Sequence, residues 1–386
     1  MVRINLFLAA VASVFTACKK SESLSEPVSQ AAREPYFYHD AEPFRCTLEG
    51  SFLKHFPTKS GEQVPGEFDE FPATISYVSA QSQLTTLEGR ARVRGQASLT
   101  VCTFPKLEFK TKDHIPSKTS PFYYDNAVKI GTHCGEGESI SSYGKLIGEK
   151  AVYREAFVYS LMSQLNVPGL KARRALIKYV DLPPRKLLGE KKAFVLESPE
   201  AMGKRLNWTH LKSKDDTWPK TFFQRLDRRQ LALIHLFNVL VGNSDYAIYG
   251  REQMITQNIM FFEAPGGALM PVSYDFDLAV MVTGKVLGRG PSVDQPASYV
   301  DPTPASSLAD IKKRLDKLKT LLRPEEIAQA IAHFKDRVTI VGPLLENFSI
   351  DPDGKAKILI RAQAFQQALS EYVPALNPQT EPIATY

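Results

Sequence analysis

Residues 236–278 read LFNVLVGNSDYAIYGREQMITQNIMFFEAPGGALMPVSYDFDL, and this stretch decides which fold the sequence predicts. The apolar run that leads into it begins at Leu231 and predicts a helix ending at Gly242, because glycine commonly terminates helices. Two short apolar runs follow, at 258–262 and 270–274, and the letters APGG between them predict a hairpin turn. The stretch is therefore expected to form a helix, a loop and two paired strands.

Four short polar side chains fall at the ends of these elements: Asp245, Asn258, Asp275 and Asp277. Nucleotide-bound Mg²⁺ takes one or two carboxylates and a neutral amide oxygen, with phosphates and water as its other ligands. We therefore expect Asn258 and Asp275 to bind the metal, and Asp277 to be a second ligand or a supporting carboxylate. Asp245 is expected to be the catalytic residue that orients or deprotonates an acceptor hydroxyl. Taken singly, these residues also fit a helix C-cap and a solvated strand end, and it is their combination and order that indicate a site.

This order of a catalytic Asp, an Asn on a hairpin and an Asp-Phe-Asp triplet resembles the atypical protein kinases, and most of all the spore-coat CotH kinase-like family. Three further stretches are similar to that family: RVRGQAS at 92–98 to its RG-x-S segment, FPKLEFK at 104–110 to its Pro-Lys-rich strand, and YREAF at 153–157 to its Arg-Glu helix. A set of secreted or lipid-anchored bacterial relatives resembles the chain more closely still. The shared segments are Cys-x-Phe-Pro, Lys-x-x-Thr-His-Cys, Gly-Asn-Ser-Asp and Tyr-Asp-Phe-Asp, and the resemblance covers roughly residues 85–285.

The resemblance implies an α+β fold of two lobes, of the atypical kinase-like type, with ATP as co-substrate and Mg²⁺ or Mn²⁺ as the metal. The residue pattern agrees with this fold. Alternating polar and apolar residues between 36 and 130 predict an antiparallel sheet, and helical spacing from 306 onward predicts helices. We expect a β-rich N-terminal lobe with one long helix at 36–200, and a larger helical lobe that carries the metal site at 201–386.

A kinase-like small lobe needs a lysine that binds the nucleotide phosphates, and the sequence offers two candidates. Lys129 lies on the last strand before an expected helix at 148–165, which is the position of this lysine in protein kinases, whereas the CotH resemblance favours Lys106. Each lysine also fits a solvated strand face. Glu155, near the start of that helix, is expected to pair with the lysine, or else to be a surface glutamate near a helix N-terminus. Arg94, in the segment similar to RG-x-S, is also expected at the nucleotide.

Glu197 ends an expected strand at 193–197. In kinase-like folds this strand leads into the segment that contacts adenine, so we expect the backbone of Leu196 and Glu197 to bind the base. Residues 207–221 are expected to form an irregular insertion over the cleft. The Gly-rich basic run at 283–292 either lines a phosphate channel or is an ordinary loop.

The N-terminus has the pattern of a bacterial lipoprotein signal. A short positive start and an apolar run at 6–15 precede small residues and Cys18, so we expect cleavage before Cys18 and lipidation of its sulfur. Residues 19–35, rich in Ser, Glu and Lys, are expected to be a flexible tether. The chain would then be anchored only by lipid at the periplasmic face of the cell envelope, with Lys19 favouring the outer membrane. Plain secretion is the alternative, because Phe15 departs from the lipoprotein pattern.

Cysteine usage adds a constraint on this exported chain. After lipidation of Cys18, three cysteines remain in an oxidising compartment. Cys102 and Cys134 flank expected neighbouring strands, so we predict a disulfide between them and a free or buried Cys46. His133 adjoins Cys134, but no second ligand pair at metal spacing accompanies it, so zinc ranks below a disulfide.

Composition narrows the range of functions. Hydrophobic residues make up 43% of the 386 residues and charged residues 23%, with a net charge of +6 and no basic run interleaved with aromatics. We therefore expect no nucleic-acid partner, and instead a nucleotide and an unknown protein or envelope acceptor. The alternative is a catalytically inactive kinase-fold scaffold, because Gly-x-Gly-x-x-Gly and His-Arg-Asp motifs are absent and the periplasm holds little ATP. A hydrolase is not indicated, because no Gly-x-Ser-x-Gly motif is present and the histidines are scattered.

Overall fold

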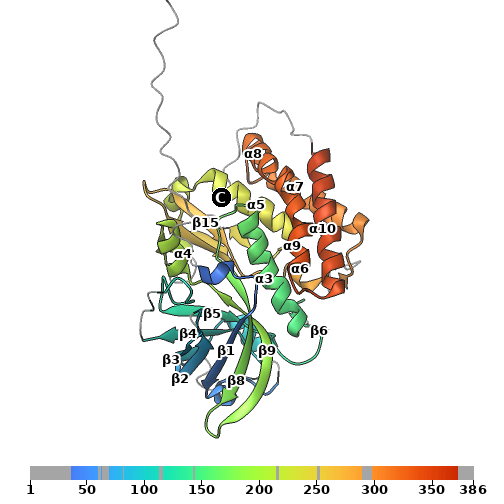
Figure 1. Ribbon diagram of the computed structural model, residues 1–386. Coiled ribbons are helices and arrows are strands. Elements are labelled where there is room, and N and C mark those ends of the chain that lie inside the picture. The colour runs from blue at the N-terminus through green and yellow to red at the C-terminus, as the bar shows by residue number, and fades with distance from the viewer. Residues whose placement is uncertain are drawn as a thin grey trace, which may run out of the picture. The chain divides into compact units, whose positions relative to one another are not determined.

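Seven strands of the N-terminal half close into a barrel, in the order β1-β2-β3-β4-β5-β9-β8 (Figure 1). The computed structural model describes residues 36–59, 62, 69–80, 82–112, 115, 117–141, 144–213, 217–249, 253–288 and 298–372. The barrel strands are β1 (Phe44–Gly50), β2 (Phe71–Val78), β3 (Leu84–Val93), β4 (Leu107–Thr111), β5 (Ala127–Gly131), β8 (Ala172–Asp181) and β9 (Lys186–Leu196).

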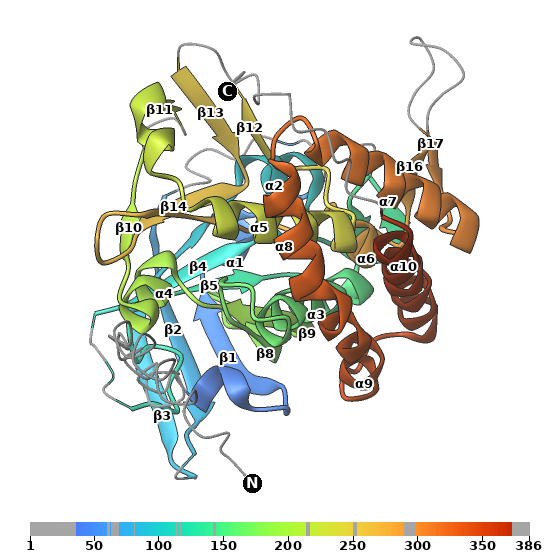
Figure 2. The same cartoon turned by 90° about the horizontal axis from the view of Figure 1, so that it is seen from above.

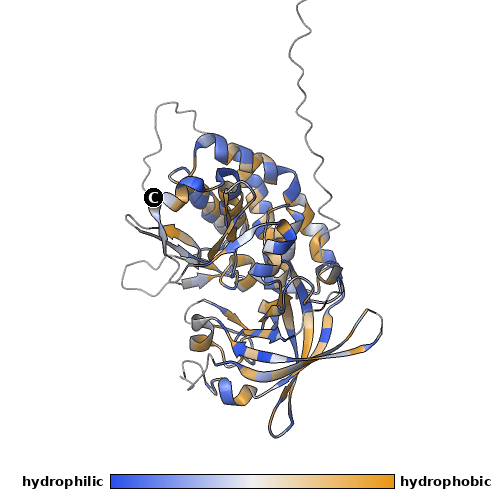
Figure 3. Ribbon diagram, turned by 90° about the vertical axis from the view of Figure 1, so that its left-hand side faces the viewer, coloured by the Kyte–Doolittle hydropathy of each residue, from blue (hydrophilic) through white to orange (hydrophobic). Residues whose placement is uncertain are grey.

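Alternation of side chains explains why these strands enclose a core. Inward residues such as Leu48, Ile75 and Phe109 are almost completely buried, whereas their neighbours along each strand are partly or fully exposed, and Figure 3 shows the resulting bands along the barrel. All neighbouring strands are antiparallel except β1 and β8, which pair in parallel. The predicted antiparallel sheet is therefore present, and it is closed by one parallel pair that the alternation did not predict.

A second hydrophobic core lies among helices and a three-stranded sheet. The main helices are α3 (Glu149–Gln164), α5 (Arg228–Val241), α7 (Pro304–Leu318), α8 (Pro324–Lys335) and α10 (Pro352–Glu371), and the sheet has the order β10 (Thr209–Leu211), β14 (Ile259–Glu263), β15 (Leu269–Ser273). Both cores belong to the unit Pro35–Tyr386. The predicted α+β class, with a sheet lobe followed by a mostly helical lobe, is confirmed.

Shorter elements complete the described chain. They are η2 (Tyr36–His39), α1 (Phe52–His55), α2 (Gln96–Val101), β6 (Ser139–Ile140), β7 (Leu146–Ile147), α4 (Pro199–Leu206), β11 (Thr217–Pro219), η3 (Lys220–Arg225), β12 (Ala247–Tyr249), β13 (Gln253–Gln257), α6 (Val280–Thr283), β16 (Val286–Gly288), β17 (Ser298–Val300), η4 (Arg337–Ile340) and α9 (Val341–Glu346). None of the described helices is both long and apolar enough to cross a membrane. The signal sequence with Cys18 and the tether lie outside the described residues, as do residues 289–292 of the Gly-rich run at 283–292.

Helix α3 joins the two lobes, because it contacts β8 and β9 of the barrel as well as α6 and α9 (Figures 1 and 2). Such a helix is apolar on most of its circumference, since solvent reaches little of it. Phe157 and Leu161 are fully buried, and even Arg154 is only 2% exposed because its guanidinium pairs with Asp351. Charged side chains on α3 are thus placed inside the molecule.

The stretch at 236–278 forms the elements that its sequence predicts. Helix α5 ends with Gly242 in the left-handed conformation, at φ 75°, where a side chain would clash with Val280 and Arg361. Strands β14 and β15 then form a hairpin whose turn holds Gly266 and Gly267 at positive φ. The segment after β15 carries Asp275, whose carboxylate contacts Lys106 directly before the barrel strand β4.

Candidate functional site

Lys106 places a buried ammonium group where the barrel meets the helical lobe. It directly precedes β4, whose residues Leu107 and Phe109 point into the barrel, so Lys106 lies on the outer face. Its Nζ lies 2.5 Å from Asp275 Oδ1 and 3.0 Å from Asp277 Oδ2. Only 5% of Lys106 is exposed, so these carboxylates replace water as the partners of its charge.

Helix α3 supplies the third carboxylate at this ammonium group. Glu155 Oε1 lies 3.5 Å from Lys106 Nζ, and Glu155 is itself only 5% exposed. The structure therefore brings together four residues that the sequence assigned to one site: Lys106, Glu155, Asp275 and Asp277. Of the two lysine candidates, it is Lys106 and not Lys129 that faces Glu155.

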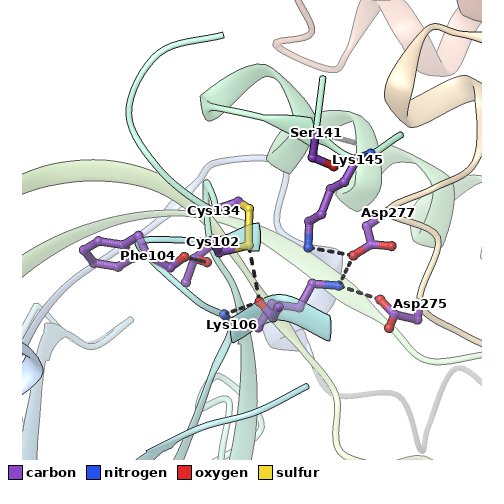
Figure 4. The surroundings of a disulfide bond; sticks show 10 residues. Cys102, Phe104, Lys106, Cys134, Ser141, Lys145, Asp275 and Asp277 are labelled. Atoms are coloured by element: carbon purple, nitrogen blue, oxygen red, sulfur yellow. Dashed lines mark hydrogen bonds and ion pairs between the residues drawn. A yellow bond between two sulfur atoms is a disulfide. The ribbon is translucent and has the colours of Figure 1, made fainter. Parts of the chain in front are cut away.

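The Asp-Phe-Asp triplet is held by the aromatic residue at its centre. Phe276 is fully buried, and its ring lies 5.1 Å from that of Tyr159 and 5.6 Å from that of Phe237. Asp275 adopts a left-handed backbone, at φ 58°, and its N–H donates to the Tyr159 hydroxyl at 3.1 Å. Because Phe276 is fixed in the helical core, the two flanking carboxylates point out of that core and towards Lys106 (Figure 4).

Lys145 is a fifth member of this site, and the sequence analysis missed it. Its Nζ lies 2.8 Å from Asp277 Oδ2, the oxygen that Lys106 also contacts (Figure 4). Lys145 directly precedes β7, and its backbone N–H donates to Ser141 Oγ at 3.1 Å. No motif marks this lysine in the sequence, because its partner lies far away along the chain. We call Lys106, Lys145, Glu155, Asp275 and Asp277 the Lys106 cluster.

Burial and mutual charge set the protonation states within the Lys106 cluster. Burial alone would lower the pKa of Lys106, but Asp275, Asp277 and Glu155 hold that pKa well above its usual value. Burial opposes ionisation of Asp277, yet Lys106 and Lys145 hold its pKa below its usual value. Burial raises the pKa of Glu155 to about 7, against the attraction of Lys106. Lys106 and Asp277 are therefore charged at neutral pH, whereas Glu155 is close to its titration point.

Asp245 and Asn258 form a second group next to the Lys106 cluster. Asn258 Nδ2 donates to Asp245 Oδ2 at 2.9 Å and to the Asp245 carbonyl at 2.5 Å, and Gln257 Nε2 donates to Asp245 Oδ1. Asn258 has a left-handed backbone, at φ 53°, directly before β14. Burial raises the pKa of Asp245, and the nearby charges of Asp277 and Asp275 raise it further. A cavity of about 120 Å³ opens beside Asp245 and is lined also by Ser244.

Lys129 and Arg94 lie on the same outer barrel face as Lys106. Lys129, on β5, holds its Nζ 6.0 Å from the centre of the Tyr274 ring, and burial together with Arg94 lowers its pKa to about 8. Arg94 lies opposite Lys106, since its N–H donates to the Lys106 carbonyl at 2.9 Å. Its Nε is buried and has no hydrogen-bond partner within the described part of the chain. These two cations therefore flank the Lys106 cluster without joining it.

Glu197 is placed differently from the other predicted site residues. Its carboxylate binds the Arg205 guanidinium through two bonds of 2.9 and 2.8 Å, and the residue is fully buried. Its backbone N–H donates to the Lys171 carbonyl at 2.9 Å. The structure thus gives the Glu197 side chain a place inside the fold and does not bring it to the Lys106 cluster.

The predicted disulfide between Cys102 and Cys134 is present, and Cys46 is free and buried. The disulfide lies next to Phe104, whose N–H donates to the Cys134 carbonyl at 3.0 Å (Figure 4). The adjacent His133 carbonyl accepts the N–H of Gly148, the N-cap of α3, at 2.8 Å. One covalent bond therefore ties the strand start that carries Lys106 to the helix start that carries Glu155.

The described side chains do not form a metal site that is complete without a ligand. Among the described residues, no three His, Cys, Asp or Glu side chains are grouped so that they could hold a metal ion alone. A cation at this site would need ligands from a second molecule, as it has when it accompanies a nucleotide. His133 is buried against Phe104, with its Nε2 3.6 Å from Glu136 Oε1, and it is not part of a metal site among these residues.

Comparison with known proteins gives a similarity of fold and no similarity of sequence family. No protein-family model matches the chain, and no curated protein matches it in sequence. Among solved structures, the chain is similar to a proinflammatory kinase of Helicobacter pylori, CtkA, with 8% sequence identity and a TM-score of 0.36. The match covers 70% of this chain and 93% of that one. The function proposed below rests on the side chains of the site and not on this similarity.

Proposed function

We propose that the chain is a kinase-like phosphotransferase that uses ATP with Mg²⁺ or Mn²⁺. The observation that carries this proposal is the buried Lys106 ammonium, which lies between Glu155 of α3 and the Asp-Phe-Asp triplet after β15. Protein kinases need a lysine–glutamate ion pair and a metal-binding aspartate in place together. Phosphoryl transfer is mostly positioning and neutralisation of charge, and these are the tasks such a cluster can perform.

Each residue of the site then has a task in binding the nucleotide. Lys106 would bind phosphate oxygens in place of Asp275, and Glu155 would hold the lysine in that position. Asp275, which is one-third exposed, and the Asn258 amide oxygen offer the carboxylate and neutral oxygen that suit Mg²⁺. Bound there, the metal would neutralise charge on the phosphates. Lys129 and Arg94 remain predicted contacts to the nucleotide.

Asp245 is the residue proposed to orient the acceptor. Its raised pKa suits a carboxylate that accepts a proton from a hydroxyl group, and the cavity beside it leaves room for that group. The acceptor is proposed to be a protein or an envelope molecule that carries a hydroxyl.

Export and lipid anchoring at Cys18 are part of the proposal. The N-terminal sequence pattern supports them, and the disulfide between Cys102 and Cys134 suits an oxidising compartment. We expect the Cys18→Ser chain to leave the membrane fraction, and mass spectrometry of the wild-type chain to detect a diacylglycerol-modified cysteine. An unmodified N-terminus on the membrane-bound chain would contradict the anchoring.

One observation favours a protein that binds nucleotide without transferring phosphate. Both carboxylate oxygens of Asp245 already accept amide N–H groups, from Gln257 and Asn258, so its capacity to accept a further proton is reduced. Asp245→Asn separates the two functions. A phosphotransferase should keep nucleotide binding and lose phosphate transfer in this variant, whereas a scaffold has no transfer to lose.

Thermal unfolding of the full chain with ATP and Mg²⁺ or Mn²⁺ tests the proposed function. Ligand at a hundred times its Kd should stabilise the fold by about 2.7 kcal/mol, and Asp275→Ala should abolish that gain. Asp301→Ala is the control, because Asp301 is likewise an aspartate paired with lysine, here Lys285 and Lys357, but its side chain is 63% exposed. A folded wild-type chain that no nucleotide stabilises would refute the phosphotransferase.

A further inference from the structure

The two ends of the Asp-Phe-Asp triplet are neutralised to different degrees. Asp277 Oδ2 contacts two ammonium groups, Lys106 at 3.0 Å and Lys145 at 2.8 Å, and the Asp277 side chain is 15% exposed. Among the described residues, the Asp275 carboxylate pairs with one ammonium group, that of Lys106, through Oδ1, and the Asp275 side chain is 34% exposed. Asp277 thus has its full complement of positive charge from the protein, whereas Asp275 keeps an oxygen for another cation.

The position of Lys145 is set by the backbone around it. Its N–H donates to Ser141 Oγ at 3.1 Å, and its carbonyl accepts the Ser141 N–H at 2.9 Å. Strands β6 and β7 pair on either side of this turn, and Gly148, which follows β7, is bonded to the His133 carbonyl at 2.8 Å. The Lys145 side chain is only 11% exposed. The backbone of Lys145 is held by these hydrogen bonds and its side chain is largely buried, so the position of its ammonium group at Asp277 is fixed by the protein.

A lysine ammonium and a divalent metal can perform the same electrostatic task at a phosphate. Sites that use two metal ions hold them about 4 Å apart, so that charge on both sides of the transferred group is neutralised. A compact ammonium supplies one positive charge without needing further ligands. At Asp277 that position is already taken by Lys145, and a metal ion could bind Asp277 Oδ2 only by displacing it.

We propose that Lys145 takes the place of a second divalent cation, so that the chain binds a nucleoside triphosphate together with a single metal ion. This inference rests on the proposed nucleotide function and adds its metal stoichiometry and a positioning residue. The single ion is held by Asp275 and Asn258, while Asp277 holds Lys106 and Lys145 against the phosphates. Lys145 is therefore a positioning residue: its ion pair with Asp277 fixes that carboxylate, and its positive charge neutralises charge on the phosphates.

Counting bound Mn²⁺ tests this inference without an activity assay. The full chain is titrated with Mn²⁺ in the presence of a non-hydrolysable ATP analogue, and free Mn²⁺ is measured by electron paramagnetic resonance. We expect one ion per wild-type chain, two for Lys145→Ala, and one for Lys145→Arg, which restores the charge. Lys150→Ala is the control, because Lys150 pairs with Glu138 at the surface nearby, and it should stay at one ion.

The outcomes separate this inference from the function on which it rests. Two ions on the wild-type chain would overturn the role of Lys145 and leave the nucleotide function intact. A single ion on Lys145→Ala with the analogue bound would also overturn it, and would make Lys145 a purely structural residue. No binding of analogue or Mn²⁺ by any folded variant would remove both. If Lys145→Ala does not fold, Lys145→Gln, which keeps most of the side-chain volume, takes its place.

Discussion

The guanidinium of Arg361 and the ammonium of Lys106 are both buried among oxygen atoms, but the partners of the two groups differ. Arg361 is fully buried and donates to the carbonyls of Leu240 and Val239 at 2.9 and 2.6 Å, and to Asp310 at 2.7 Å. Within the described ranges, the partners of Arg361 thus include one carboxylate, that of Asp310. Lys106 faces three carboxylates and no neutral acceptor at its Nζ among the described residues.

This difference separates a cluster that stabilises the fold from one suited to a ligand. We call Arg361, Asp310 and Arg314 the Arg361 cluster. The Arg361 guanidinium caps the last turn of α5, whose carbonyls have no donors within the helix, and Arg314 donates to the Asn243 carbonyl just beyond that helix. The Lys106 cluster has three carboxylates for two ammonium groups, and the raised pKa of Glu155 reflects that excess together with burial. A cluster with surplus negative charge is suited to a further cation, and the Arg361 cluster is not.

Replacing Arg361 should give the largest loss of stability among the variants compared below. We expect Arg361→Met to lower the free energy of unfolding by about 3 to 5 kcal/mol, because it leaves the Leu240 carbonyl buried without a donor and removes a buried cation from Asp310. Urea unfolding measures this loss. Arg361→Lys should lose part of it, since the three N–H groups of an ammonium share one nitrogen and do not span the positions that three guanidinium nitrogens reach. Arg185→Met is the control, because Arg185 is exposed, and a loss as large there would contradict the comparison.

The disulfide should matter next, and chiefly for the Lys106 cluster. Replacing Cys102 and Cys134 by serine should lower the free energy of unfolding by about 3 kcal/mol, because the bond closes a loop of 32 residues in the unfolded chain. The same double variant should also weaken any nucleotide-dependent stabilisation, since the bond ties Lys106 to the start of α3. Cys46→Ala is the control for loss of a buried cysteine. A double variant that loses stability but keeps the full nucleotide-dependent stabilisation would contradict a local role for the disulfide at the Lys106 cluster.

Local sequence patterns predict the parts of the fold that depend on neighbours in the chain. The end of α5 at Gly242 and the hairpin of β14 and β15 were predictable, because glycine positions and apolar periodicity encode them directly. Closure of the barrel was not predictable, because β1 and β8 pair in parallel across more than a hundred residues and neither strand marks its partner. The disulfide was predictable because so few cysteines remain to choose from.

Within the candidate site, residues in recognisable motifs were found and residues in plain loops were missed. Lys106, Asp275 and their neighbours stand in segments with a characteristic order, and the structure brings them together. Lys145 stands in a short turn with no periodicity, and only its approach to Asp277 reveals it. Glu197, in contrast, was predicted at the site but lies elsewhere in the fold. It occupies a predicted strand end, but a buried partner, Arg205, lies eight residues further on and was not foreseeable.

Two buried histidines, His133 and His235, offer a second comparison, of a ring without hydrogen bonds among the described residues and a hydrogen-bonded ring, through the pH dependence of stability. Burial lowers the pKa of both His133 and His235 to about 4, from 6.5. The unfolded chain therefore takes up protons below about pH 6.5 that the folded chain refuses until about pH 4, so acid destabilises the fold over that window. His235 Nδ1 bonds the Tyr246 hydroxyl at 2.9 Å, whereas His133 Nδ1 has no hydrogen-bond partner among the described residues and His133 Nε2 lies 3.6 Å from Glu136 Oε1, beyond hydrogen-bond distance.

At pH 7, replacing His133 and replacing His235 should consequently have opposite effects on the free energy of unfolding. Between pH 7 and pH 4, each histidine should account for roughly 2 to 3 kcal/mol of lost stability, and His133→Leu should abolish its share. At pH 7, His133→Leu should be neutral or stabilising by about 1 kcal/mol, because it removes buried ring nitrogens that make no hydrogen bond among the described residues. His235→Leu should be destabilising at pH 7, because it leaves the Tyr246 hydroxyl unpaired. Urea unfolding at several pH values decides, and an unchanged acid slope in His133→Leu would count against the prediction.

The smallest effect on stability is expected at the residue that matters most to the proposed function. Asp275→Asn removes one of three carboxylates but leaves Asp277 and Glu155 with Lys106, and its amide oxygen can still accept from the ammonium. The free energy of unfolding should therefore change by less than about 1 kcal/mol, or rise, because surplus negative charge is relieved. Asp310→Asn, in the Arg361 cluster, should cost at least about 2 kcal/mol, because it removes the carboxylate shared by two guanidinium groups. Equal losses in these two variants, measured by urea unfolding with unchanged m-values, would make the Lys106 cluster a structural ion network like the other. A loss confined to Asp310→Asn would show that Asp275 is retained for a ligand and not for the fold.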